Sequence, residues 1–240
     1  ALQRGELELY FQPRISLLDQ SWNGAEVLLR WLHPELGMIP PDKFIPLAEE
    51  TGLILPIGEW VIGEACRQLS RWQAEGGPIS RLSVNVSPLQ LQRQDLAATI
   101  QGALRFNRLN PVCFEVEITE SALMRDMEKS IAMLQELRQI GVKISLDDFG
   151  TGYSSLSTLR NLPIDVLKID RSFLLRVHES DNDAKFLAAI ISMADTLQIG
   201  VVAEGIECAE QEQVLIELGC SEGQGYYYAR PMPAIEIQNR

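Results

Sequence analysis

Strand-like and helix-like segments alternate along this chain from about residue 56 onward, and this alternation constrains its fold more than any other feature. Helical periodicity is expected at 57–75, 128–140, 182–199 and 209–218. Short strands are expected at 81–87, 113–119, 142–148, 166–170 and 200–204. Repeated strand–helix units predict a parallel sheet with helices packed outside it. The 240 residues also match the length of one α/β barrel, about 250 residues.

The beginning of the chain departs from this order. Residues 7–18 and 25–33 are both strand-like, and we expect a polar turn containing Asn23-Gly24 between them. Two strands in direct succession predict a hairpin, with one early strand antiparallel to the rest. A last strand is expected at 226–229. The sequence therefore predicts a TIM-like (β/α)8 barrel with an irregular start, forming a single domain over 1–240 because no low-complexity linker divides the chain.

The charge balance disfavours several kinds of partner. Lys and Arg number 21 against 33 Asp and Glu, so the formal net charge is −12. Such a surface repels duplex nucleic acid, whose binding depends on cationic contacts to phosphates, and contact with a membrane surface is also disfavoured. The four cysteines form no C-x-x-C pair and there are only two histidines, so a zinc site is not expected.

Targeting segments are not expected either. No run approaches the about 20 apolar residues needed to span a bilayer. The chain has no signal peptide, and it begins with Ala1 rather than Met. We therefore expect a cytoplasmic domain cut from a longer protein, and the parent chain can still be anchored in the inner membrane.

The predicted strands alternate in polarity, although strands of a parallel sheet are usually apolar on both faces. In 114–119, Glu115 and Glu117 share one face and the apolar side chains share the other. An antiparallel sheet with one wet face is an alternative, but the intervening helices argue against it. In a β/α barrel, polar residues late in a strand lie at the C-terminal mouth, where such barrels hold their chemistry. Residues of this kind are Asn85, Glu117, Asp147, Lys168 and Glu204. By the same alternation, Glu26 and Arg30 lie on the polar face of their own strand.

The chemistry of this set favours divalent metal ions. Its carboxylates are those of Glu26, Glu117, Asp147, Asp148 and Glu204, and Lys168 is the one nearby cation. Charges about 4 Å apart repel by about 4 kcal/mol at an effective dielectric of 20, so these acids converge only if some protonate or cations bind. Oxygen donors select Mg²⁺ or Mn²⁺ over Zn²⁺, and two such ions suit in-line displacement at phosphorus. Any one of these acids can instead be interpreted as a helix N-cap or a surface charge. That interpretation does not explain why the whole set shares one face.

The motifs along the chain resemble those of the EAL domain family, the cyclic di-GMP-specific phosphodiesterases. The name-giving triplet reads Glu26-Val27-Leu28, with Val in place of Ala, and we expect this departure to affect packing only. The matching motifs are FQP (11–13), EVLLRW (26–31), FIPLAEETG (44–52), NVSP (85–88), EITE (117–120), DDFGTGYSSL (147–156), LKIDRSF (167–173), AEGIE (203–207) and QGYYYARP (224–231).

This resemblance implies a role for each matching residue. Two metal ions are implied, Mg²⁺ or Mn²⁺. The first would be bound by Glu26, Asn85, Glu117 and Asp147, and the second by Asp147 and Asp148. Four catalytic residues are implied. Lys168 would hold the nucleophilic water or the scissile phosphate, Glu204 would be general base or second-site ligand, and the other two are Asp148 and Glu120.

The resemblance also implies substrate contacts and a catalytic loop. Gln224 would orient site water, while Gln12 and Arg30 would contact the substrate. Asp170 and Glu207 would support the same region. Glu120 would fix the loop at 147–156.

The implied reaction is hydrolysis of one 3′,5′-phosphodiester of cyclic di-GMP to linear 5′-pGpG. Members of the family usually dimerise near the loop, and flanking sensor or cyclase-like domains are implied in the full-length protein. An alternative is a module that binds cyclic di-GMP, signals to a partner and does not cleave. Such modules typically lose metal ligands or the DDFGTG loop, and both are retained here. A barrel enzyme for another phosphorylated metabolite is disfavoured because the whole motif series matches.

Overall fold

The alternating strands close into an eight-stranded β/α barrel, as the sequence predicts. The computed structural model describes residues 1–93, 95–150 and 156–238. The sheet order is β10-β1-β9-β8-β7-β6-β5-β4-β2-β3, and the pairing of β1 with β2 completes the ring. The barrel strands are β1 (Leu7–Ser16), β2 (Trp22–His33), β4 (Arg81–Asn85), β5 (Phe114–Thr119), β6 (Lys143–Phe149), β7 (Val166–Ile169), β8 (Gly200–Glu204) and β9 (Glu222–Gln224). Two short strands, β3 (Gly37–Ile39) and β10 (Met232–Pro233), extend the sheet.

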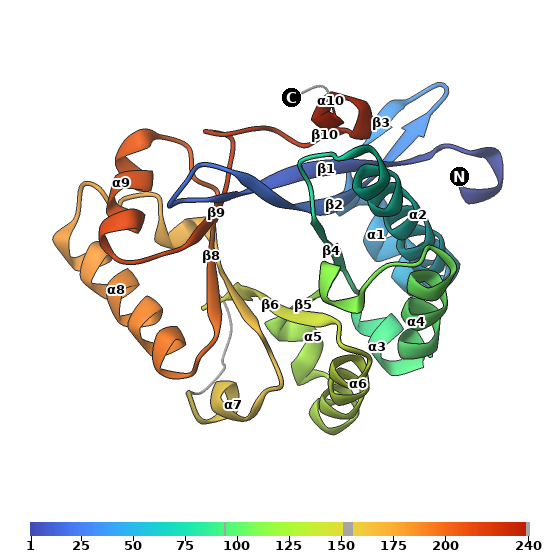
Figure 1. Cartoon of the computed structure of the whole chain (residues 1–240). Helices are drawn as coiled ribbons and strands as arrows, with labels where there is room; N and C mark the ends of the chain where they lie inside the picture. The colour runs from blue at the N-terminus through green and yellow to red at the C-terminus, as the bar shows by residue number, and fades with distance from the viewer. Residues whose placement is uncertain (94, 151–155, 239–240) are drawn as a thin grey trace.

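Helices surround the barrel, which buries the apolar faces of the strands (Figure 1). The figure shows α2 and α4 on the right, α6 below, and α8 and α9 on the left of the strands. Trp72 of α2 and Phe114 of β5 are fully buried in the core between these layers. The α-helices are α1 (Pro41–Glu50), α2 (Ile54–Glu75), α3 (Pro88–Arg93), α4 (Leu96–Phe106), α5 (Glu120–Met124), α6 (Met127–Ile140), α7 (Leu156–Asn161), α8 (Asp181–Thr196), α9 (Ala209–Glu217) and α10 (Ala234–Gln238). Short 3-10 turns are η1 (Leu2–Arg4), η2 (Pro111–Cys113) and η3 (Arg171–Phe173).

The irregular start is also confirmed, because β1 runs antiparallel to β2, β9 and β10. The predicted position of its turn is wrong, since Asn23 and Gly24 lie inside β2. The backbone instead closes the hairpin between Ser16 and Ser21, where Ser16 N donates to Ser21 O at 2.9 Å. Asp19 stabilises that turn by accepting hydrogen bonds from both the backbone and the hydroxyl of Ser21.

The strand predicted at 226–229 is wrong as well. The strand in this region is β9, and the chain turns immediately after it. Gly225 passes so close to another segment that a Cβ there would lie 2.0 Å from the carbonyl oxygen of Ile206. Tyr228 N and Ala229 N both donate to Gly225 O, which fixes the turn. Gln224 is thereby the last barrel residue of β9.

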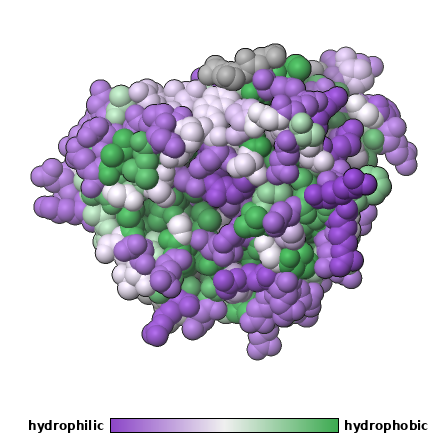
Figure 2. All heavy atoms as spheres, viewed as in Figure 1, coloured by the Kyte–Doolittle hydropathy of each residue, from purple (hydrophilic) through white to green (hydrophobic). Residues whose placement is uncertain are grey.

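The outer surface is mainly polar. Figure 2 shows hydrophilic side chains over most of the visible face, with hydrophobic groups in scattered spots between them. Within the described residues, we find no helix with both the length and the apolar character needed to span a membrane.

Candidate active site at the barrel mouth

The ammonium of Lys168 lies among four carboxylates at the C-terminal ends of the strands. Its Nζ is 2.6 Å from Glu117 Oε2 and 2.7 Å from Glu204 Oε1. Glu26 Oε2 and Asp147 Oδ1 follow at 3.5 Å and 3.6 Å. Lys168 and Glu117 are fully buried. The residues that the alternation along the strands predicts on one face therefore lie close together in the structure.

Sheet topology explains why these side chains converge. Around the closed ring, β7 and β2 are four strands apart in either direction, so they form opposite walls. Lys168 from β7 consequently reaches across the interior toward Glu26 on β2. Asn85 and Glu117 are register partners in the parallel pair β4–β5. Each strand thus delivers its polar side chain to the same end of the barrel.

Two amide side chains hold Glu26. Asn85 Nδ2 donates to Glu26 Oε1 at 2.8 Å, and Gln224 Nε2 donates to Glu26 Oε2 at 2.8 Å. Gln224 Nε2 also donates to Gln12 Oε1 at 3.1 Å, and Gln12 Nε2 donates to Ala229 O at 3.2 Å. Glu26 is therefore oriented by residues from both ends of the chain.

Burial and crowding perturb the charges of this cluster. Burial by itself lowers the pKa of Lys168, but the carboxylates around it, Glu117 and Glu204 first, raise that pKa well above its ordinary value. Burial raises the pKa of Glu117, and the like charge of Glu26 raises it further. Burial also raises the pKa of Glu204 to about 7, against the opposing effect of Lys168. One ammonium does not balance these acids, so some of them retain protons.

The residues fit a hard divalent cation by their chemistry. Every donor is an oxygen atom, and the buried Glu117 Oε1 has no hydrogen-bond partner within the described part of the chain. As the side chains lie, no three of the described His, Cys, Asp and Glu residues form a preformed metal cluster. The carboxylates are instead drawn to the Lys168 ammonium. The fit therefore rests on the donor set, its excess negative charge and the unpaired oxygen of Glu117.

The predicted catalytic loop is described only in part. Asp148 has a φ of 54°, an unusual backbone conformation for a residue other than glycine, and its N–H donates to Asp147 Oδ1 at 2.9 Å. Burial raises the pKa of Asp148, and the neighbouring charge of Asp147 adds to this effect. Glu120 is buried at the first position of α5. Residues 151–155 lie outside the described residues, so the predicted contact between Glu120 and the loop stays a prediction.

Two cavities adjoin the cluster. One has a volume of about 210 Å³ and is lined by Glu26 and Glu204 together with Gln12, Gln224, Asp170 and Glu207. The other, about 450 Å³, has Arg30, Asn85 and Ser87 among its polar lining residues and apolar side chains from α1 and α2, including Ile45 and Ile57.

A comparison with known proteins identifies the family. The chain matches the family described as "EAL domain" over residues 1–231. It belongs to the EAL domain family.

Named relatives of this EAL domain act in cyclic di-GMP signalling. It is 44% identical over 237 residues to the bifunctional diguanylate cyclase/cyclic di-GMP phosphodiesterase MucR of Pseudomonas aeruginosa, covering 99% of this chain and 35% of MucR. It is 42% identical over 238 residues to the cyclic di-GMP phosphodiesterase NbdA of the same organism, covering 99% of this chain and 30% of NbdA. The chain thus spans about a third of the length of these relatives. The solved structure "PaMucR Phosphodiesterase, c-di-GMP complex" superposes with a TM-score of 0.92 at 44% identity, over 99% of this chain and 96% of that one.

The EAL domain brings together most of the site residues that the sequence predicts. Glu26, Asn85, Glu117, Asp147, Lys168, Glu204, Gln12 and Gln224 form one connected cluster. Asp170 and Glu207 line the smaller cavity, and Arg30 lines the larger one. The individual roles of these residues stay predictions.

Sequence reasoning missed some residues that border the smaller cavity. Arg171, Gly205 and Tyr226 line it beside the predicted residues. The guanidinium of Arg230 lies over the Tyr226 ring, 4.3 Å from its centre. Each is adjacent in sequence to a predicted site residue or within a matched motif, which is the signal that could have found them. The wrong strand at 226–229 hid Tyr226 in particular.

Proposed function

We propose that this EAL domain is a metal-dependent phosphodiesterase that hydrolyses cyclic di-GMP to linear 5′-pGpG. The observation that carries the proposal is the convergence of four carboxylates on a single buried ammonium at the barrel mouth. Such an excess of oxygen donors suits two Mg²⁺ or Mn²⁺ ions, which in turn suit a phosphodiester substrate. The similarity to MucR and NbdA supports the choice of cyclic di-GMP.

The residues that would hold the two ions lie on four neighbouring strands. We assign the first ion to Glu26, Asn85, Glu117 and Asp147, and the second to Asp147 and Asp148. Asn85 donates through Nδ2 to Glu26, which leaves its Oδ1 atom as the donor to a cation. Bound there, the ions would lower the pKa of a water and neutralise phosphate charge.

Other residues of the cluster would handle the proton and the phosphate. The pKa of Glu204, raised by burial to about 7, suits a general base at neutral pH, so this carboxylate is placed to accept the proton of the attacking water. Lys168 is a hydrogen-bond donor at the same spot and would orient the water or a phosphate oxygen. Gln224 keeps Glu26 in position through an amide hydrogen bond, and Gln12 accepts a second hydrogen bond from the same amide of Gln224.

The two cavities give room for the two halves of the dinucleotide. Both adjoin β2, one beside Glu26 and the other beside Arg30. Arg30 supplies a guanidinium for a phosphate or a base edge in the larger cavity. Asp170 and Glu207 supply carboxylates in the smaller one, and carboxylates accept hydrogen bonds from the N–H groups of guanine.

The deciding experiment follows cyclic di-GMP incubated with the domain and Mg²⁺ or Mn²⁺, read by chromatography beside an EDTA control. Metal-dependent appearance of pGpG is the expected result. Tight binding of cyclic di-GMP without product would instead identify a receptor module. Indifference to cyclic di-GMP would refute both and direct attention to another phosphorylated substrate.

We further propose that residues 1–240 form one functional unit of a longer signalling protein and that the unit acts as a homodimer. The lengths of MucR and NbdA, of which the chain spans about a third, support the first point. Size-exclusion chromatography with light scattering tests the second.

A further inference from the structure

Two adjacent aspartates of the mouth lie in a β-bulge at the end of β6. Asp147 and Asp148 together stand opposite one residue of β7, Lys168. The register resumes where Phe149 pairs with Ile169. Adjacent residues of a regular strand point to opposite faces, and a bulge removes this restriction. Phe149 packs against the hydrophobic core, so the bulge lets both aspartates serve the mouth while the next residue returns to the apolar side.

The bulge depends on an unusual backbone conformation at Asp148. Its φ of 54° lies in the left-handed region, which favours glycine. Other residues keep such a conformation only where the surrounding structure enforces it, and such positions are common at functional sites. Burial and the charges of Asp147 and Asp170 raise the pKa of Asp148, so its carboxylate faces the other acids of the mouth.

The segment after β7 holds the far end of the bulge. Gly150, two residues after Asp148, has a φ of 91° and packs against the ring of Phe173 in η3. A Cβ on Gly150 would lie 2.5 Å from Phe173 Cζ and 2.8 Å from Phe173 Cε2, so only glycine fits there. Among the described residues, the three atoms nearest that Cβ position all belong to this ring. The ring tip of Phe173 therefore limits where the turn after Asp148 can lie.

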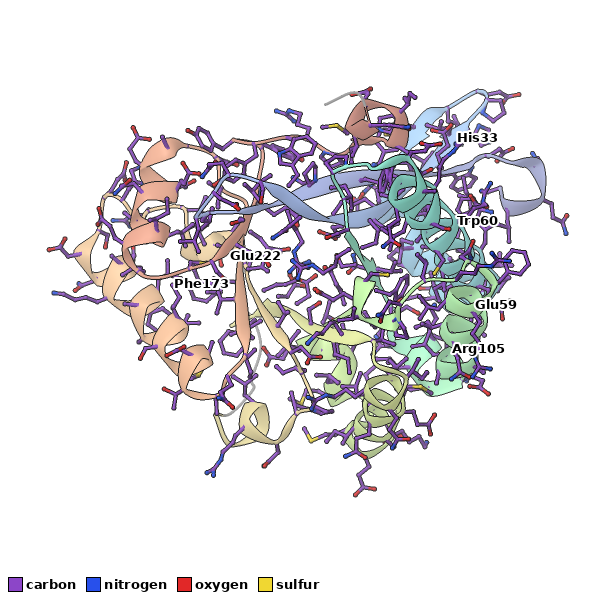
Figure 3. All side chains as sticks on the ribbon, viewed as in Figure 1. His33, Glu59, Trp60, Arg105, Phe173 and Glu222 are labelled. Atoms are coloured by element: carbon purple, nitrogen blue, oxygen red, sulfur yellow. The ribbon has the colours of Figure 1, made fainter. Side chains whose placement is uncertain are left out.

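Phe173 is itself fixed by its neighbours. Its N–H donates to Asp170 O at 3.1 Å. Its ring stacks on Phe186 of α8 with the ring centres 5.7 Å apart, and Figure 3 labels Phe173 on the side of the barrel that α8 covers. The next residue, Leu174, is fully buried, and its carbonyl oxygen accepts a hydrogen bond from Gln211 Nε2 of α9 at 3.0 Å. The ring that meets Gly150 thus rests on the outer helices.

We propose that Phe173 is a positioning residue for the second metal ion: through its contact with Gly150 it holds the bulge in the conformation that presents Asp148 to the mouth. Phe173 touches neither the ion nor the substrate in this scheme and acts through the backbone of the turn. The inference rests on the proposed function, because it assumes that Asp148 binds the second ion.

The two proposed ions should respond differently to a loss of this contact. Three of the four proposed ligands of the first ion, Glu26, Asn85 and Glu117, lie on β2, β4 and β5, and none of these strands pairs with β7. The second ion takes both of its proposed ligands from the bulge. Displacement of the turn should therefore weaken the second ion selectively, whereas a general loosening of the barrel would weaken both.

The test measures Mn²⁺ binding by calorimetry, with thermal unfolding recorded for every variant. Phe173→Leu keeps an apolar side chain but removes the ring tip that meets Gly150. Gly150→Ala disturbs the same contact from the other side, and the double variant combines the two changes. Phe186→Leu is the matched control, since it removes the other ring of the stacked pair.

We expect Phe173→Leu to weaken the second Mn²⁺ ion about tenfold, the typical size of an effect transmitted by a neighbour of metal ligands. The first ion should change by less than about threefold, as should both ions in Phe186→Leu, which is the range of a substitution away from the site. The double variant should bind the second ion no more weakly than Gly150→Ala alone, because both changes act on one contact and are not additive.

Three results would overturn the inference: a folded Phe173→Leu variant with both affinities unchanged, an equal loss for both ions, or additive losses in the double variant. If Phe173→Leu does not fold, Phe173→Tyr decides. It keeps the ring and adds an oxygen to Cζ, the atom nearest Gly150, so it should displace the turn and weaken the second ion selectively. An unchanged second ion in Phe173→Tyr would then refute the inference.

The unchanged chain separates this inference from the proposed function. Binding of no Mn²⁺, or of one ion only, would refute the proposed two-ion site and this inference with it. Two bound ions, held equally well by the unchanged chain and by Phe173→Leu, would refute the inference alone.

Discussion

Glu204 should make the metal-free protein less stable as the pH rises. Its pKa is about 7 in the folded protein against an ordinary value of 4.5, because burial disfavours the charged form. Between those pH values the folded state keeps a proton that the unfolded state has lost, so the free energy of unfolding falls as pH increases. One pKa unit corresponds to about 1.4 kcal/mol, which makes this contribution about 3.5 kcal/mol at most. The side chain is 20% exposed, so water reduces the effect below that bound.

The assay is urea unfolding in EDTA at pH 5 and pH 7.5 for the unchanged chain and for Glu204→Gln. The unchanged chain should lose stability between the two pH values, and Glu204→Gln should lose less, by up to about 3 kcal/mol. Glu207→Gln is the matched control, since it removes a carboxylate from the same cavity. Saturating Mg²⁺ should flatten the pH dependence of the unchanged chain. An identical pH dependence in the unchanged chain and Glu204→Gln would refute the reasoning.

Three further substitutions probe the mouth and its surroundings. Glu26→Ala should reduce pGpG formation more than about 100-fold and weaken Mn²⁺ binding. Glu26 is proposed as a direct metal ligand, and residues that only contact such ligands already contribute about 10–100-fold. Normal turnover would remove Glu26 from the ligand set. Lys168→Met should lower the free energy of unfolding by about 3–5 kcal/mol at pH 7.5 and by less at pH 5, because the four carboxylates lose their ammonium. Urea titrations at both pH values measure this loss. An equal loss of stability at pH 5 and pH 7.5 would contradict the prediction. Gly225→Ala should lower the free energy of unfolding by about 1–3 kcal/mol, since its Cβ would lie 2.0 Å from the Ile206 carbonyl oxygen; an unchanged urea midpoint would show that the turn can relax.

The sequence predicts the mouth because strand parity is a local property. Glu117 and Glu204 alternate with apolar neighbours in strands that helices must cover, so their inward direction follows from the pattern. The positions of the strand ends follow in the same way, and together they place the carboxylates at one end of a barrel.

What the sequence does not predict depends on contacts between distant segments. The Asn23-Gly24 pair has the composition of a turn, yet it lies in β2. A Cβ added to Gly24 would lie 3.3 Å from the Arg81 side chain. The tyrosines after Gly225 have the composition of a strand, but the close approach to Ile206 forces a turn. Neither of these two close contacts can be predicted from a short window of sequence. The ion pairs of Arg14 with Glu115 on β5 and Glu222 on β9 are not predicted for the same reason.

The antiparallel first strand has a consequence for how the chain folds as it is made. β1 pairs early with β2, its neighbour in sequence, but it completes the ring only when it meets β9, where Ile15 pairs with Gly223. Contacts at such sequence separation form slowly, because a long loop must be closed first. Gln224, which orients Glu26, arrives with the same strand. The chain can therefore form most of its strands and helices before β9 is synthesised, whereas the cluster at the barrel mouth is complete only after β9 has joined the ring.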